Sequence, residues 1–474
     1  MSAEDHASSD AKTPCHDGTS RRKRRVVTAL AFVAVLAVVD VLLCFALQPY
    51  GEHTELMWRE YRQTPSVDTI LVGTSTTAYG LKPQVLDEHL GSHSFNMSTP
   101  GQIVDNVLAT VETACSDHQI KRVFMCVGYE TLLEDPYINL STVFTQAKIQ
   151  GESPAQALSD IGRLLGYRYF FERHESLTGL FPWAYDHVPL SPSNIVENIR
   201  NRAECDVFEA GKRWCARYSP KWTYEGQGYG GYHIGLKAEA KHGDVVGHYE
   251  ADKPVSSYSL DAFKSMCAYC RQRGVHLYVL GALYTPSAVE AYENHYTERM
   301  QALKEIVEAQ DGTYLDLSML RREELNPSVD FFWDHVHLTD KGAIETSKTV
   351  SQLVKRIEAG EDVSGLFYGY DQDGWDAYRA SIDFVDSLDY TYEVTQEGAR
   401  IEAHARTGTQ TPVAYQLEVK DDSGQWRVVR AFECASEFTL PRDGHDGATI
   451  RITARATNGH QDVDRSVEGP VSFT

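Results

Sequence analysis

The stretch VDTILVGTSTTAYG, residues 67–80, begins as an apolar run and ends in small hydroxyl-bearing residues. Residues 67–72 have the composition of a buried strand, and Gly73 ends that run. The cluster that follows, at 74–78, permits two interpretations. Ser and Thr after a glycine are typical of a helix N-cap. A serine at the end of a buried strand is also a candidate nucleophile, and Ser75 occupies that position.

Strand and helix patterns alternate along the chain on the C-terminal side of this stretch. Further strands are expected at 94–97, 122–127, 275–280 and 313–317, and helices at 103–114, 259–273, 296–309 and 341–357. This alternation of apolar strands with helices predicts an α/β domain over about 60–360, with a parallel sheet covered on both faces. Active sites of such sheets lie at the carboxyl ends of strands, which is where Ser75 is expected.

An aromatic-rich interruption at about 135–257 divides this domain, with stretches such as GYRYFFERHE and WTYEGQGYGGYH. Insertions of this length between core elements often carry binding surface. Two interpretations stay open. The aromatic side chains either pack a small subdomain over the sheet or form a cleft wall on which sugar rings lie.

The pattern changes in the last part of the chain, at 385–474, where short segments alternate polar and apolar residues. They include YTYEV, RIEAHA, AYQLEV and WRVVRAF, and turn clusters such as DDSG and RDGHDG separate them. Seven such segments in under a hundred residues predict an all-β, immunoglobulin-like sandwich.

The N-terminal region carries the basic run RRKRR at 21–25, followed directly by an apolar run at 26–47. The apolar run is long enough to cross a bilayer, and the basic residues place 1–25 in the cytoplasm and the later domains outside. The alternative is a cleaved signal peptide, but no small-residue cleavage site precedes Gln48. Asp40, inside the apolar run, either lies near the outer leaflet or docks on a membrane partner.

Charge and cysteine content exclude some functions. The chain has 67 acidic and 45 basic residues and a formal charge of −22, which argues against a nucleic-acid partner. Cys205 and Cys215 are spaced to close a short loop. The C-x-x-C at Cys267 and Cys270 lies within a helical pattern, so it is interpreted as core packing or a local disulfide and not as a zinc or redox site.

The stretch FFWDHVHLTDKGA, residues 331–343, supplies the residues that would activate a serine. Asp334 and His337 are three residues apart in an expected loop, so the carboxylate can accept a hydrogen bond from one ring nitrogen. The other nitrogen is then free to act as a base on a hydroxyl. His335 is the competing base, but its spacing from Asp334 is too short for this arrangement.

Together these two stretches resemble the SGNH/GDSL hydrolases. In that family a serine follows the first strand in a G-D-S-like block, and a D-x-x-H block before the last helix supplies the acid and the histidine. Gly73-Thr74-Ser75 and Asp334-x-x-His337 match these blocks. The resemblance implies a three-layer, flavodoxin-like fold, a Ser75–His337–Asp334 catalytic triad, and no cofactor or metal.

The middle blocks of the family match more loosely. The second block corresponds to 96–101, with the backbone N–H of Gly101 as the implied oxyanion donor. Thr74 replaces the usual aspartate of the first block. Glu130 stands where the third block has an asparagine, and an ionised glutamate cannot donate a hydrogen bond to an oxyanion.

The chain is most similar to membrane-anchored members of the family that add or remove acyl groups on cell-envelope polymers, such as alginate O-acetylation and teichoic-acid D-alanine transfer proteins. The resemblance implies a serine esterase or O-acyltransferase that acts on a cell-envelope polysaccharide outside the cell membrane. It also implies a membrane-bound O-acyltransferase as partner. The alternative function is an inactive scaffold that binds polysaccharide and recruits such an enzyme.

Overall fold

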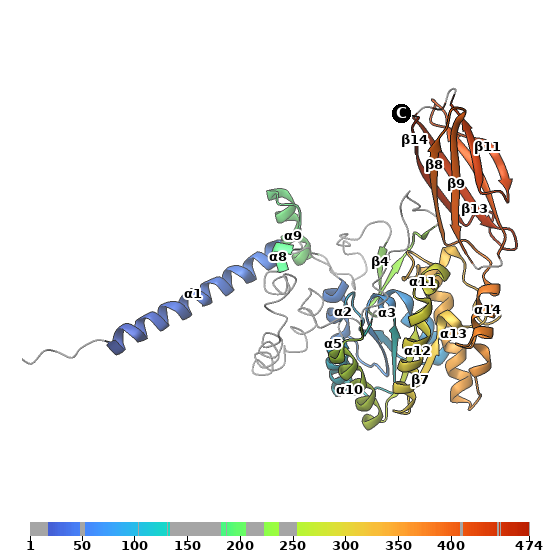
Figure 1. The fold of residues 1–474 in the computed structure, drawn as a ribbon. Coiled ribbons are helices and arrows are strands. Elements are labelled where there is room, and N and C mark those ends of the chain that lie inside the picture. The colour runs from blue at the N-terminus through green and yellow to red at the C-terminus, as the bar shows by residue number, and fades with distance from the viewer. Residues whose placement is uncertain are drawn as a thin grey trace, which may run out of the picture. The chain divides into compact units, whose positions relative to one another are not determined.

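The computed structural model describes residues 18–47, 53–102, 104–129, 131–132, 182–185, 187–204, 222–236, 254–407, 411–442, 445 and 447–473 (Figure 1). The chain divides into two compact units. One combines Met1–Tyr50 with Phe181–Glu204, and the other holds Gly51–Leu180 and Cys205–Thr474. The described parts of the aromatic-rich insertion are therefore shared between the two units.

The first unit is built on helix α1 (Gly18–Leu47), which starts before the basic run and continues through the whole apolar stretch. Its segment Arg22–Leu47 is, among the described residues, the one helix long and apolar enough to cross a membrane. The apolar N-terminal helix is thus confirmed. Two short helices, α8 (Pro182–Tyr185) and α9 (Pro192–Glu204), belong to the same unit.

A five-stranded parallel sheet forms the centre of the second unit. Its strands are β1 (Thr69–Gly73), β2 (Ser94–Asn96), β3 (Arg122–Val127), β6 (His276–Gly281) and β7 (Thr313–Asp316). They lie in the order β2-β1-β3-β6-β7, and every neighbouring pair is parallel. The predicted α/β class is therefore confirmed. The order reverses between β1 and β3, and ligands of open α/β sheets bind at such a reversal, beyond the carboxyl ends of the strands.

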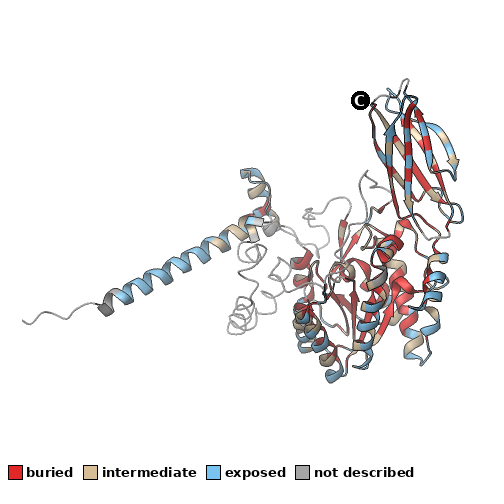
Figure 2. Ribbon diagram, in the orientation of Figure 1, coloured by how far each residue is buried: buried red, intermediate tan, exposed pale blue. Residues whose placement is uncertain are grey.

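Helices cover both faces of this sheet, which explains why its strands are apolar throughout. Successive side chains of a strand point to opposite faces, so Ile70 and Val72 enter one buried cluster and Leu71 enters the other. The central strands are largely buried between the helices (Figure 2). The helices around the sheet are α2 (His53–Tyr61), α3 (Ser75–Gly80), α4 (Pro83–Leu90), α5 (Val104–Asp117), α10 (Ser257–Arg273), α11 (Pro286–Ala291), α12 (Glu293–Glu308), α13 (Asp340–Glu358) and α14 (Gln372–Ser381).

A β-hairpin from the insertion packs on this domain. Its strands are β4 (Trp222–Gly226) and β5 (Tyr229–Tyr232). The backbone N–H of Asn96, at the end of β2, donates to Gln227 O over 2.8 Å. Gly228 has φ +75°, and a Cβ there would lie 1.8 Å from Asn96 O, so the turn requires glycine to approach this closely. The turn therefore seats the hairpin against the end of β2.

The C-terminal region is all-β and antiparallel, as predicted. Its seven strands are β8 (Ser387–Val394), β9 (Gly398–Arg406), β10 (Val413–Lys420), β11 (Trp426–Glu433), β12 (Glu437–Pro441), β13 (Ala448–Ala456) and β14 (Arg465–Val471). They form one sheet in the order β11-β10-β13-β14 and another in the order β12-β9-β8. Alternate side chains, such as Leu417, Ile450 and Ile452, form one buried cluster.

The cysteines of the C-x-x-C motif are buried in α10 as free thiols. The local-disulfide interpretation is therefore wrong, and the core-packing interpretation holds. Burial raises the pKa of each thiol to about 12, so Cys267 and Cys270 are held protonated. Cys205 and Cys215 lie outside the described residues, as does most of the aromatic-rich insertion.

Candidate active site

Ser75 is the first residue of α3, directly beyond the carboxyl end of β1. Thr74 occupies the N-cap position with extended backbone angles (φ −88°, ψ −164°), and its side chain makes no capping hydrogen bond. The carbonyl of Thr74 accepts from the backbone N–H groups of Thr77 and Ala78. The Ser75 side chain is directed elsewhere, because its Oγ lies 2.7 Å from His337 Nε2. Ser75 is thus not a helix cap.

The turn that presents Ser75 is held to the neighbouring strand. Gly73 has φ +131°, and a Cβ there would lie 2.6 Å from Thr77 Oγ1. That hydroxyl in turn accepts from the backbone N–H of Cys126, in β3, over 3.0 Å. A larger residue than glycine at position 73 would strain the backbone and displace Thr77. Glycine therefore fixes the direction in which the chain leaves β1.

His337 lies between Ser75 and Asp334. Its Nδ1 is 2.8 Å from Asp334 Oδ2 and 3.0 Å from Oδ1, and its Nε2 faces the serine. With Nδ1–H donating to the carboxylate, the tautomer leaves the Nε2 lone pair to accept from the Ser75 hydroxyl. The structure therefore brings three of the predicted site residues into one chain of hydrogen bonds.

Asp334 is held by its own loop. Its Oδ1 accepts from the backbone N–H groups of Val336 and His337 over 2.9 and 2.8 Å. Desolvation alone would raise the pKa of this carboxyl, but the hydrogen bonds from the His337 ring and these two N–H groups outweigh it and hold the pKa below its usual range. The carboxylate therefore stays ionised, which favours a positive charge on His337 when the ring takes a proton.

The loop that carries both residues is fixed at the start of α13. Thr339 is the N-cap of this helix, and its Oγ1 accepts from Gly342 N and donates to Asp330 O. A Cβ at Gly342 would lie 2.3 Å from Phe331 O, so the helix start can approach the loop this closely only with glycine. These contacts hold the D-x-x-H turn without using the side chain of His337.

His335, the competing base, is directed away from Ser75. Its Nδ1 lies 3.0 Å from Thr285 Oγ1, and its carbonyl accepts from Thr285 N over 3.1 Å. Thr285 is the N-cap of α11, beyond the end of β6. The two histidines of the stretch therefore have different neighbours, and His337 is the one beside the serine.

Gly101 lies in a loop that packs on the end of β1. Leu71 O accepts from Met97 N over 2.7 Å, and Gly73 O accepts from Thr99 N over 3.1 Å. Gly101 itself has φ +67°, which favours glycine. The loop thus reaches Gly73, two residues before Ser75. Glu130 lies outside the described residues.

Aromatic rings surround the His337 side chain, whose exposed fraction is 18 %. Tyr79 and Trp333 contact His337 with centroids 6.0 and 5.4 Å away. Tyr232, from the inserted hairpin, stacks on Trp333 at 3.8 Å with an interplanar angle of 6°, and meets Tyr79 edge-on at 4.9 Å. None of these rings was predicted from the sequence to lie at the site. The sequence could have indicated two of them by their position, since Tyr79 lies within 67–80 and Trp333 within 331–343.

A second ring contact leads away from the site. His53, at the start of α2, stacks on Tyr79 at 6.0 Å and is 3 % exposed. Its Nε2 donates to Gly228 O over 2.8 Å, while Nδ1 is buried without a hydrogen-bond partner. Burial lowers the pKa of His53 to about 4, although the hydrogen bond to Gly228 acts in the opposite direction.

Ligand atoms of Glu225, His233 and Asp340 lie within 4.8 Å of one another, which would suit a metal ion. The Lys82 ammonium group, however, is 2.7 Å from a carboxylate oxygen of Glu225 and of Asp340. The lysine already supplies the positive charge that these carboxylates require, so this cluster does not fit a metal centre.

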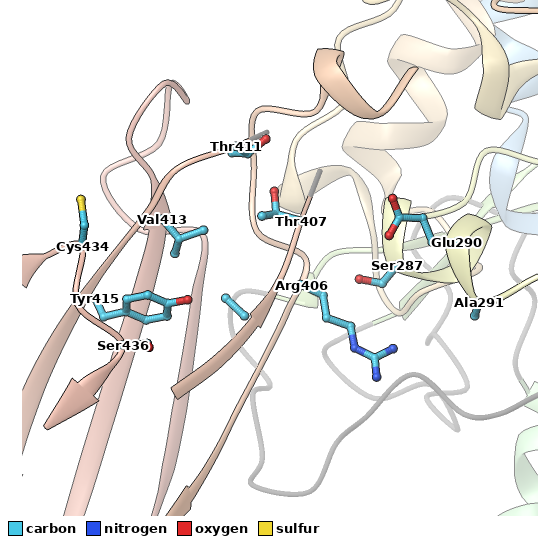
Figure 3. A pocket seen from close by; sticks show the side chains of 11 residues that line it. Ser287, Glu290, Ala291, Arg406, Thr407, Thr411, Val413, Tyr415, Cys434 and Ser436 are labelled. Carbon is cyan, nitrogen blue, oxygen red and sulfur yellow. The ribbon is translucent and has the colours of Figure 1, made fainter. Parts of the chain in front are cut away.

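Two pockets of comparable size lie in the second of the two compact units, which also holds Ser75. The pocket in Figure 3, of about 650 Å³, runs from Ser287 and Glu290 of α11 to the C-terminal strands and includes none of the predicted site residues. Another, of about 560 Å³, is lined by Tyr232, His233, Thr339 and Lys341. It adjoins the Tyr232–Trp333 ring pair through Tyr232, and the loop that carries Asp334 and His337 through Thr339, which makes it the pocket more relevant to the Ser75 site.

In a comparison with family models and with curated protein sequences, no family model and no curated protein matches this chain.

Proposed function

We propose that this protein is a serine esterase or O-acyltransferase of the SGNH type. The observation that carries the proposal is the continuous hydrogen-bond chain from Ser75 Oγ through His337 to Asp334, with links of 2.7 and 2.8 Å. A serine, a base that can take its proton and a carboxylate that orients the base are the parts of an activated nucleophile.

The fold supports this assignment. The strand order β2-β1-β3-β6-β7 is the doubly wound order in which ligands bind where the order reverses, between β1 and β3. Ser75 follows β1 at this position. A flavodoxin-like SGNH domain, followed by an immunoglobulin-like sandwich, is the specific architecture that we propose.

The reaction starts with proton transfer from Ser75 Oγ to His337 Nε2 as the oxygen attacks an ester carbonyl. The backbone N–H groups of Ser75 and Gly101 are the proposed donors to the oxyanion, a role that supplies a large share of the stabilisation in acyl transfer. The protonated His337, with Asp334 beside it, then returns the proton to the departing alcohol. An acyl-serine remains, which water or a sugar hydroxyl resolves.

The proposed substrate is an acylated polysaccharide of the cell envelope. The Tyr232–Trp333 stack lies beside the reactive histidine and borders a pocket of about 560 Å³, and aromatic rings next to such a pocket suit the apolar faces of sugars. Helix α1 is the proposed single-pass anchor that holds the enzyme outside the cell membrane. A membrane-bound O-acyltransferase is the proposed partner.

Hydrolysis of p-nitrophenyl acetate by the purified full-length protein in detergent micelles tests this function. We expect a burst of p-nitrophenol stoichiometric with enzyme, as the acyl-serine forms, and no burst in Ser75→Ala. Addition of an oligosaccharide acceptor separates the two activities, because a transferase would yield acylated sugar. A folded wild-type protein with no burst would favour the scaffold function.

A further inference from the structure

The last turns of α1 are contacted by the α8–α9 segment, whose described residues are 182–185 and 187–204. The indole Nε1–H of Trp183 donates to Asp40 Oδ1 over 2.7 Å. Asp40 lies seven residues before Leu47, the last residue of the helix. At a rise of about 1.5 Å per residue, the contact lies about 10 Å along the helix axis from its C-terminal end.

Two further hydrogen bonds hold the same segment at the end of α1. Leu47 O accepts from Val188 N over 2.9 Å, and Ala46 O accepts from Asn198 Nδ2 over 3.0 Å. The last carbonyls of a helix have no partner within the helix, so they need donors from elsewhere. The α8–α9 segment supplies two of these donors and so caps α1.

The segment nevertheless leaves large apolar side chains exposed. Leu190, Val196 and Ile199 are 67 %, 57 % and 37 % exposed, and the last two share a face of α9 because they are three residues apart. In the last turns of α1, Val41, Leu42 and Phe45 are 51–66 % exposed as well. The apolar surface of α1 therefore has an apolar neighbour at its C-terminal end.

We infer that the α8–α9 segment is a second membrane contact, which lies in the outer leaflet against the end of α1. This inference rests on the proposed anchoring of α1 in the membrane. The hydrocarbon core of a bilayer is about 30 Å thick, and the 22 residues of the apolar run 26–47 span about 33 Å as a helix. A ring about 10 Å from the end of α1 therefore reaches lipid.

Lipid fits the chemistry of this surface. Trp183 combines a polar N–H, occupied by Asp40, with a large apolar ring, the combination that is enriched at membrane interfaces. Helix α9 has apolar side chains at 195, 196 and 199 and polar ones at 194, 197, 198, 200 and 201, as expected of a helix in the plane of an interface. The Trp183 donor also offsets part of the cost of placing Asp40 in the apolar span.

Fluorescence quenching by brominated phosphatidylcholine tests the inference on the full-length protein in liposomes that contain no other protein. The chain has 7 tryptophans. If lipid quenches the fluorescence of one of them, the total emission should decrease by about one seventh. We expect this decrease in wild type, its loss in Trp183→Phe, and its persistence in Trp426→Phe, since Trp426 lies in β11 of the C-terminal domain. Circular dichroism checks that each variant is folded.

A second variant addresses the apolar face and keeps Trp183. We expect Leu190→Asp combined with Val196→Asp to reduce the quenched emission by at least half. Resistance to a carbonate wash reports the anchor separately: if wild type washes off, the proposed anchoring fails. If the protein stays in the liposomes but Trp183→Phe leaves the quenching unchanged, the second membrane contact is refuted.

Discussion

Two histidines contact the same ring, Tyr79, from different regions of the molecule and have opposite surroundings. His337 lies in the loop before α13, with a carboxylate on one nitrogen and a serine hydroxyl on the other. His53 lies in α2, with a carbonyl on one nitrogen and no partner on the other. The first side chain is 18 % exposed and the second residue is 3 % exposed.

The difference shows what makes a histidine a candidate base. Burial among aromatic rings is common to both residues, so it does not select for proton transfer. A carboxylate on Nδ1 stabilises the protonated ring at His337. His53 has only the Gly228 carbonyl as a partner, and burial outweighs that hydrogen bond and lowers the pKa of His53 to about 4. We therefore propose a role in proton transfer for His337 and a role in packing for His53.

The largest effect is expected from Asp334→Asn. The amide cannot stabilise the imidazolium and favours the wrong tautomer, so the burst rate with p-nitrophenyl acetate is expected to fall on the order of 10⁴-fold. Asp330→Asn is the matched control, because this carboxylate lies four residues before Asp334 and makes a long contact of 3.5 Å with Lys341 at the start of α13. That variant should stay within twofold of wild type, and an equal loss in both would contradict the role of Asp334.

The next effect concerns His53 and the pH dependence of stability. The unfolded chain takes up a proton at this residue near pH 6.5, while the folded protein takes it up only at about pH 4. The free energy of unfolding should therefore fall as the pH is lowered from 7 to 4. The contribution of this residue is about 3 kcal/mol.

Urea unfolding of wild type and His53→Phe at pH 7 and pH 4.5 measures this contribution. We expect a smaller loss of stability on acidification in the variant, since it has no titrating group at this position. His460→Phe is the control, because that side chain is 78 % exposed. Identical pH profiles for wild type and His53→Phe would show that His53 is not held neutral by burial.

A smaller effect is expected at Thr339, which fixes the loop that carries His337. Thr339→Ala removes a capping acceptor for Gly342 N and a hydroxyl donor to Asp330 O. The expected cost in the free energy of unfolding is about 1–2 kcal/mol. Urea unfolding monitored by circular dichroism measures it, and no change would mean that the loop is held without this cap.

The smallest effect is expected at Thr74, the N-cap residue next to Ser75. Its side chain makes no capping hydrogen bond, so Thr74→Ala should change the free energy of unfolding by less than about 0.5 kcal/mol. Comparison with Thr339→Ala under the same conditions is direct, since both residues are threonines at helix starts. A cost equal to that of Thr339→Ala would restore the capping interpretation of this turn.

Local patterns in the sequence predict much of the fold. The apolar runs at β1, β3 and β6 mark buried strands, and Gly274 ends α10 in a left-handed conformation, as its position after the helical pattern predicts. The D-x-x-H spacing also predicts that a carboxylate and an imidazole can meet, because three residues within one loop suffice. The pairing with Ser75 depends on strand order, which the α/β pattern restricts.

Such local patterns do not predict contacts between segments that are far apart in the sequence. Nothing local at Tyr232 indicates that it stacks on Trp333, because this depends on where the turn at Gly228 seats the hairpin. Nothing in the sequence near His53, which follows the apolar run 26–47, indicates that this residue is buried against Tyr79. For Asp40, neither sequence interpretation included a partner within the chain, since Trp183 lies 143 residues away.

A fluorophosphonate probe reports directly whether the Ser75 hydroxyl is activated. The full-length protein in detergent, with Ser75→Ala and His337→Ala beside it, is treated with the probe, and the intact mass of each is measured. We predict one adduct on wild type, mapped to Ser75, and none on either variant. Absence of an adduct on folded wild type, or an adduct that persists in Ser75→Ala, would contradict the account.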